Sequence, residues 1–81
     1  MFQITIFHND DQGATLQETI DECESHGLAV VSKVFRSEWD EWAITLRGSK
    51  EQFLAWDRDA MEGSPGYDPE ELLAELLPVA V

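Results

Sequence analysis

Two N-terminal capping signals divide this chain into segments of different kinds, and they restrict its fold more than any other feature of the sequence. A capping box places Ser or Thr just before a helix and Glu or Gln three residues later, so that side chains satisfy the first amides of the helix. The pattern occurs at Thr15–Glu18 and again at Ser49–Gln52. We therefore expect one helix to start after each box, with strands before the first box and between the two.

The residues around these boxes fit that division. Apolar residues alternate with polar ones near the N-terminus, which predicts a half-buried strand: Phe2, Ile4 and Ile6. Residues 28–35 (LAVVSKVF) are rich in β-branched and aromatic side chains, and residues 42–46 alternate again. The short link at 38–41 predicts a hairpin between these two strands. The first helix shows an apolar face and ends at Gly27, and that face consists of Leu16, Ile20 and Cys23.

The C-terminal part predicts two more helices. The second box opens a helix that should turn Phe53, Trp56 and Ala60 inward, together with Leu54 and Met61. Residues 63–66 (GSPG) break it. Asp68 then serves as the N-cap of a third helix and Pro69 as its first residue. Its buried stripe should comprise Leu72, Leu73, Leu76 and Leu77. Pro78 should end it, and residues 79–81 are either a short fourth strand or a loose tail.

The resulting order, β-α-β-β-α-α, predicts an α+β fold in a single domain that spans residues 1–81. An antiparallel sheet with helices on one face, as in a ferredoxin-like or split βαβ plan, matches this order best. An open sheet with an additional helical pair is the alternative. Because a short sheet leaves an edge strand exposed, both a monomer and a homodimer are compatible with the sequence.

The sequence favours a cytoplasmic protein that is not bound to a membrane. No apolar run approaches the ~18 residues that a membrane span requires. The N-terminus has no basic region followed by a long apolar one, so we expect no secretory signal. The single Cys23 cannot form an internal disulfide, which favours a reducing compartment.

Charge is the main anomaly. The chain holds 17 acidic residues against five Lys and Arg, for a net charge of −12. Residues 1–32 contain six acids and no Lys or Arg, and residues 51–81 contain eight acids and one base. Because like charges at this density repel one another and destabilise a compact state, we expect the surplus to serve a function.

Catalysis and metal binding are not indicated. Cys23 falls on the apolar face of its helix, where a thiol is ordinarily buried and inert. His8 and His26 are the only histidines, and neither has a nucleophile near it in sequence. The acids do not match the spacing of a calcium-binding loop, and one Cys with two separated His residues does not match a zinc site. We therefore expect no enzymatic activity, no cofactor and no metal.

Two acidic clusters are the candidate binding residues. The first lies on one face of the first helix, with two acids before it: Asp10, Asp11, Glu18, Asp21 and Glu22. The second occupies the predicted hairpin: Glu38, Asp40 and Glu41, with Trp39 among them. Trp42 alternates in step with Ile44 and Leu46, so we expect it to point to the core with them. Trp39 is therefore the better candidate for an exposed anchor at a protein interface.

Rows of carboxylates resemble the charge pattern of a nucleic-acid backbone. A protein that binds DNA or RNA presents Lys and Arg to the phosphates, and an acidic protein can occupy such a groove instead. The predicted partner is therefore a basic protein, either a nucleic-acid-binding effector or a nuclease. Direct binding to nucleic acid is disfavoured by the negative charge. An ordinary solvated surface, adaptation to high salt, and an accessory subunit with incidental acidity remain alternatives.

In its general character the chain resembles the small acidic inhibitors of phages and mobile elements that mimic nucleic acid, among which the anti-CRISPR proteins are a large group. The resemblance covers short length, one α+β unit, high acidity and exposed acids on a helix and a hairpin. It implies binding to a CRISPR effector at the Lys- and Arg-rich surface that grips target DNA or the duplex beside its recognition motif. A nuclease inhibitor of the antitoxin type is a further alternative.

Overall fold

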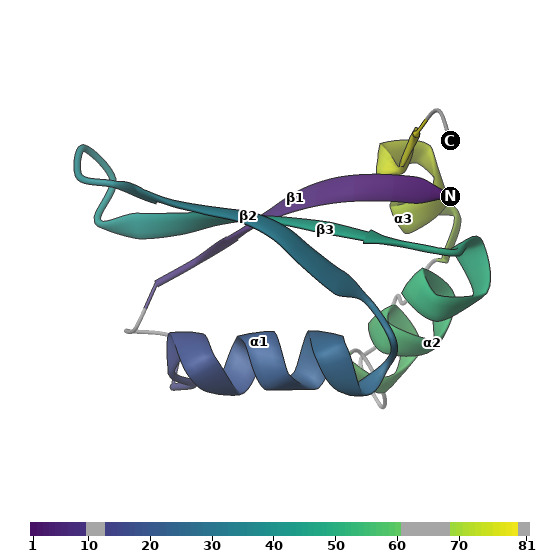
Figure 1. Cartoon of the computed structure of the whole chain (residues 1–81), viewed down its shortest axis with the longest axis horizontal. Helices are drawn as coiled ribbons and strands as arrows, with labels where there is room; N and C mark the ends of the chain where they lie inside the picture. The colour runs from purple at the N-terminus through teal and green to yellow at the C-terminus, as the bar shows by residue number, and fades with distance from the viewer. Residues whose placement is uncertain (10–12, 61–68, 80–81) are drawn as a thin grey trace.

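The computed structural model describes residues 1–9, 13–60 and 69–79. Within them it shows a four-stranded antiparallel sheet and three helices (Figure 1). The elements in chain order are β1 (Phe2–His8), α1 (Leu16–Ser25), β2 (Ala29–Arg36), β3 (Glu41–Gly48), α2 (Lys50–Ala60), α3 (Pro69–Glu75) and β4 (Leu77–Pro78). The predicted α+β class is confirmed, and the predicted order roughly matches, since a short fourth strand follows the third helix.

The strand order explains how the helices come to cover the sheet. The strands run β2-β3-β1-β4, and each neighbouring pair is antiparallel. β1 and β2 are consecutive strands, yet β3 lies between them, so α1 must cross over the sheet to connect them. This is the split βαβ arrangement, and Figure 1 shows α1 running along one side of the sheet.

The register gives the sheet two different sides. Ile4 pairs with Leu46 and Ile6 with Ile44, and these side chains turn toward the helices. Since neighbouring residues of a strand point to opposite sides, Thr5 and its partner Thr45 turn the other way. Their hydroxyl groups form a hydrogen bond of 3.0 Å on this side. We call the side without helices the open face.

One apolar cluster joins all three helices to the same side of the sheet. It contains Cys23 from α1, Phe53 from α2 and Leu72 from α3, packed with sheet and loop residues that are also buried: Ile4, Leu28, Ile44, Leu46 and Leu76. Phe53, Ile44, Leu46 and Cys23 are its largest fully buried side chains. Helices on one face of the sheet were predicted, and this cluster is the physical reason for that arrangement.

The two predicted caps differ in completeness. Before α2, the Gln52 amide donates to the Ser49 hydroxyl at 3.1 Å, and the Ser49 amide donates to the Gln52 side-chain oxygen at 2.8 Å. This is the full reciprocal capping box. Before α1, the Glu18 amide donates to the Thr15 hydroxyl at 3.1 Å, while that hydroxyl lies 3.2 Å from the Glu18 carboxylate. Each cap starts its helix at the predicted place.

The C-terminal segment departs from the prediction. Leu77 belongs to β4 and is exposed, so its assignment to the buried stripe of the third helix is wrong. α3 ends at Glu75 instead of at Pro78, and Pro78 is part of β4, where it pairs with Phe2. The fourth strand therefore lies earlier than predicted, because the chain meets β1 as soon as α3 ends. Met61, the break at 63–66, the Asp68 cap and residues 80–81 lie outside the described residues.

Candidate functional site

The predicted acidic face of α1 is exposed to solvent. Glu18, Asp21 and Glu22 are all exposed, because the opposite face of the helix buries Ile20 and Cys23. The last turn of α1 contains no basic residue. The Asp21 carboxylate accepts a hydrogen bond of 2.8 Å from Gln17 on the same helix, which holds one acid of the row in place.

Glu24 is also exposed on α1, although it was not among the candidate residues predicted from the sequence. It follows Asp21 by three residues, so the same spacing rule that selected Glu18 and Asp21 would have included it. Asp10 and Asp11, which were predicted to extend the patch, lie outside the described residues. The α1 cluster is therefore defined here by Glu18, Asp21, Glu22 and Glu24.

The second cluster lies in the turn between β2 and β3. Glu38, Trp39 and Asp40 are exposed, and the Trp39 side chain is 64% accessible. Asp40 adopts a positive φ of 50°, a conformation that Asp tolerates better than most residues. Glu41 differs from the other three, because it is half-buried and lies 3.8 Å from the guanidinium of Arg36. Its charge is thus partly compensated on the open face.

The two clusters do not form one continuous array. In Figure 1 the β2–β3 turn extends from the end of the sheet, and α1 lies apart from it on the helical side. A partner that contacts both must therefore reach around the end of the sheet.

Trp42 differs from the exposed Trp39, as predicted. It packs edge-on against Phe35 with ring centroids 5.3 Å apart, and it contacts the core.

The distribution of charge between the two sides of the molecule is uneven. Exposed acids occur on every helix: Glu18, Asp21, Glu22 and Glu24 on α1, Glu51 and Asp59 on α2, and Glu70, Glu71 and Glu75 on α3. The exposed bases of the helices are Lys50 and Arg58. On the open face the register places Arg36, Arg47 and Glu41 among neutral side chains. We call the solvent-facing surface of the three helices the acidic helical surface.

His26 joins two of these helices. Its Nε2 atom lies 2.7 Å from an Asp59 carboxylate oxygen on α2, and its Nδ1 atom lies 2.9 Å from the Glu22 carbonyl oxygen. The hydrogen bond with Asp59 raises the pKa of His26 above its ordinary value, and the Glu22 carbonyl adds to the effect. Both ring nitrogens face acceptors, so the geometry suits the doubly protonated, charged form.

This His26–Asp59 pair was missed from the sequence. The two residues are 33 positions apart, and no motif links them. Only the packing of α1 beside the end of α2 brings them together. His26 lies just after α1, where a cation offsets the negative end of the helix dipole.

The neighbourhood of His26 does not supply an activated nucleophile. The Ser25 hydroxyl lies 3.4 Å from Nδ1, but it donates to the Glu22 carbonyl at 2.6 Å. Nδ1 also faces that carbonyl and therefore carries a proton, so it cannot accept one from the serine. A catalytic serine needs a neutral imidazole nitrogen as its base. The contacts of His26 with Ser25 and Asp59 consequently act as a structural clamp, which connects the end of α1 to α2.

Cys23 and His8 both lie in the interior. Cys23 has no exposed surface, and burial raises the pKa of its thiol to about 11, with Glu22 adding to the shift. His8 is 4% exposed, and its Nδ1 atom lies 3.2 Å from the Thr19 hydroxyl. A buried thiol with a raised pKa is a poor nucleophile and a poor metal ligand, since both roles require the thiolate.

Among residues 1–9, 13–60 and 69–79, no three His, Cys, Asp or Glu side chains gather as they would around a metal ion. Within those ranges, no helix combines the length and the apolar character needed to cross a membrane. Comparison with known proteins found no matching family model, no matching curated protein and no matching solved structure.

Proposed function

We propose that this chain is a non-enzymatic inhibitor that binds the basic, nucleic-acid-binding surface of another protein. The observation that carries the proposal is the acidic helical surface, above all the exposed α1 cluster. No Lys or Arg lies in the last turn of α1, and His26, just after that helix, faces the Glu22 carbonyl and Asp59. Like charges three and four residues apart on a helix are destabilising by roughly 0.2–0.5 kcal/mol per pair. A partner that supplies Lys and Arg removes that repulsion on binding.

The α1 cluster is arranged to meet a row of cations. Its carboxylates project from a formed helix, so little backbone order must be gained on binding. The field of a chain with net charge −12 accelerates encounter with a basic surface over long range. A bound inhibitor of this kind excludes nucleic acid by competition for the same Lys and Arg side chains.

In its most concrete form the partner is a CRISPR effector, and the surface is the one that holds target DNA. A basic nuclease held by an antitoxin-type inhibitor is another form of the same mechanism. In both forms the second acidic cluster, in the turn between β2 and β3, supplies another contact. Glu38 and Asp40 provide charge, and the exposed Trp39 provides apolar area. Buried Trp residues commonly dominate the energy of protein interfaces.

The experiment begins with capture of a partner from host lysate on the immobilised protein, followed by titration of salt and of duplex DNA. Competition with DNA and weaker binding as salt rises from 0.1 to 1 M are expected, since the Debye length falls from ~10 Å to ~3 Å. The test variant is Asp21→Asn with Glu22→Gln. Its matched control is Ala29→Lys with Ser32→Lys, which changes net charge equally on exposed positions of β2.

The two variants separate local recognition from overall charge. If the α1 variant binds at least tenfold more weakly and the β2 variant retains affinity, the acidic face is the contact. Equal losses of affinity in the α1 variant and the β2 variant would mean that binding responds only to net charge. A partner that remains bound in 1 M salt and ignores DNA would sink the proposal.

A second candidate function is an accessory module that assembles through the open face. The observation in its favour is the apolar exposure there: Phe7 is 51% and Val34 56% accessible. The same salt titration distinguishes the two candidates, because an apolar contact is nearly insensitive to screening.

A further inference from the structure

The outer edge of β1 is only partly covered. β4 pairs with Phe2 and Gln3 and then ends, because the preceding residue, Leu76, turns into the core at the end of α3. Within residues 1–9, 13–60 and 69–79, no strand pairs with the remainder of β1 on this side. At ~3.4 Å per residue, the open part from Ile4 to Phe7 is about 14 Å long.

The backbone groups that point from this edge can be assigned. The Val79 amide donates to the Met1 carbonyl oxygen at 3.0 Å, so Met1 turns its backbone groups toward the β4 side. The direction alternates along a strand, and every second residue therefore does the same. Thr5 and Phe7 accordingly direct their N–H and C=O groups outward, past the end of β4.

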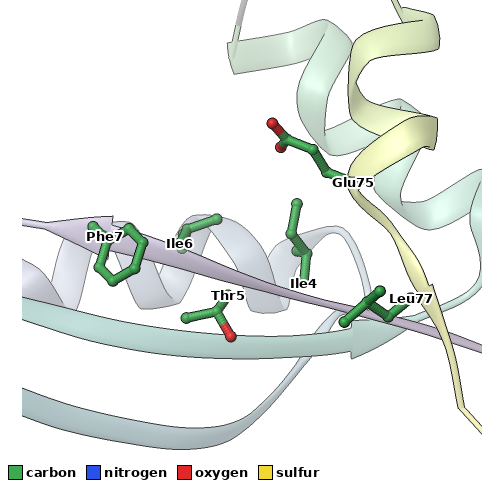
Figure 2. A pocket seen from close by; sticks show the side chains of 6 residues that line it. All are labelled: Ile4, Thr5, Ile6, Phe7, Glu75 and Leu77. Carbon is green, nitrogen blue, oxygen red and sulfur yellow. The ribbon is translucent and has the colours of Figure 1, made fainter.

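A groove of about 580 Å³ follows this edge, and its lining is mainly apolar: Ile4, Thr5, Ile6, Phe7, Glu75 and Leu77. Figure 2 shows Glu75 on the same side of β1 as Ile4 and Ile6. Since the lining includes consecutive residues of the strand, the groove runs along the edge and is not confined to one face of the sheet. Side chains of an added strand would lie on both sides of it.

The other edge of the sheet is protected, whereas the part of β1 beyond β4 is not. β2 carries an irregularity in register between Val30 and Ser32, and Lys33 follows. Bulges and lysines are common means of preventing further strand pairing. Residues 2–7 of β1 (FQITIF) contain no charge and no proline. A segment of this composition pairs readily with an incoming strand.

We propose that the open edge of β1 binds an extended segment of a partner protein as an additional antiparallel strand, with a basic residue near its carboxyl end. Such a strand runs in the same direction as β4, so its carboxyl end lies nearest Glu75. The exposed Glu75 carboxylate provides the charge that a Lys or Arg would meet. A second copy of the chain is disfavoured, because each copy has a net charge of −12. This site goes beyond the proposed function and does not depend on it.

The probe is a capped seven-residue peptide in which valine and threonine alternate and lysine is the last residue. Titration into the ¹⁵N-labelled protein should shift the amide signals of Thr5 and Phe7 and slow their hydrogen exchange. The same peptide with N-methyl groups on its edge-facing amides should bind about tenfold more weakly or worse, since ladder hydrogen bonds are lost. Equal binding of both peptides would overturn the proposal.

Two pairs of variants make the test specific. Glu75→Lys should weaken binding of the lysine peptide about two- to fivefold. It should also restore binding of a peptide that ends in glutamate. Glu71→Lys makes the same change in charge at another exposed position of α3 and should not reverse this preference. If both variants act alike, the peptide responds only to net charge, and the assignment to Glu75 fails.

Thr5→Pro removes one outward amide and should abolish binding, whereas Thr5→Val keeps that amide and should bind normally. Both lose the hydroxyl contact with Thr45, so the pair isolates the backbone group. If Thr5→Pro fails to fold, the N-methylated peptide decides the question. Slow exchange of Thr5 and Phe7 without peptide, together with a dimer in sedimentation, would show that a second copy occupies the edge and would overturn the proposal.

Discussion

The two sides of the sheet use the same strands for different purposes. On the helical side, Ile4 and Ile44 are buried in the cluster that holds three helices to the sheet. On the open face, Phe7 and Val34 remain about half exposed, with the Arg36 guanidinium 5.4 Å from the centre of the Phe7 ring. Burial on one side supplies stability, whereas apolar and basic residues on the other remain available for contact.

Charge and burial both occur on the helical side of the molecule. Acidic residues are concentrated on the exposed surface of the helices, where basic residues are few. The helical side therefore holds both the buried core and most of the exposed negative charge of the helices. The open face carries a nearly balanced set, with Glu41 beside Arg36 and Arg47 donating to Gln3 at 2.9 Å. A charged partner and an apolar partner therefore have separate surfaces available.

The largest expected effect is the contrast between two phenylalanines. Phe53→Ala removes a fully buried side chain from the core and should lower the free energy of unfolding by about 3–5 kcal/mol. Phe7→Ala, at a half-exposed position on the open face, should cost about 1 kcal/mol or less. Urea denaturation monitored by circular dichroism measures the free energy of unfolding of both variants. Similar losses would mean that the open face is part of the core of the folded protein.

Cys23 tests how completely the helical side excludes solvent. With a pKa of about 11 and no exposed surface, its thiol should react with iodoacetamide at pH 8 at least about 100-fold more slowly than a free cysteine. The rate should rise to that of a free thiol in 8 M urea. Rapid labelling of the folded protein would show that α1 separates readily from the sheet.

The caps test how far local hydrogen bonds support that side. Ser49→Ala removes one half of the reciprocal box before α2 and should cost about 1 kcal/mol. Thr15→Ala removes the corresponding bond before α1 and is the natural comparison. Because Ser49 is half-buried and Thr15 exposed, we expect the larger loss at Ser49. The reverse order would indicate that α1 depends on its cap more than on its packing.

The smallest expected effect concerns the clamp between α1 and α2. The pKa of His26 is raised in the folded state, so its contribution is fully present below the unfolded value near 6.5 and is lost as the pH rises through the folded value. The difference in melting temperature between the protein and His26→Gln should therefore be larger at pH 5.5 than at pH 9. A difference that does not change with pH would contradict a charged His26.

Much of the fold could be predicted because the responsible interactions are local. Alternation in β1 and β3, the two capping residues and Gly27 with its positive φ of 82° each act over a few residues of chain. The exposure of Glu18, Asp21 and Glu22 followed from the same reasoning, since the apolar stripe of α1 points to the core. The individual candidate acids were therefore placed correctly on the surface by helical spacing alone.

Contacts between distant segments were not accessible in this way. The exposed position of Leu77 in β4 and the pairing of His26 with Asp59 both depend on which elements meet. The partial cover of β1 belongs to the same class, because it depends on where α3 ends relative to the sheet.

The amino-acid sequence alone determined the kinds and the order of the elements as far as α3, the inward faces of β1, α1 and β3, and the surplus of negative charge, since hydrogen bonding and side-chain periodicity within a segment set these properties. Tertiary structure alone decided that the α1 cluster and the acids of the β2–β3 turn lie apart from one another, and that one strand edge stays open beside an apolar groove. Those features arise from the packing of segments far apart in the chain, where the position of one helix end determines how much of a neighbouring strand is paired.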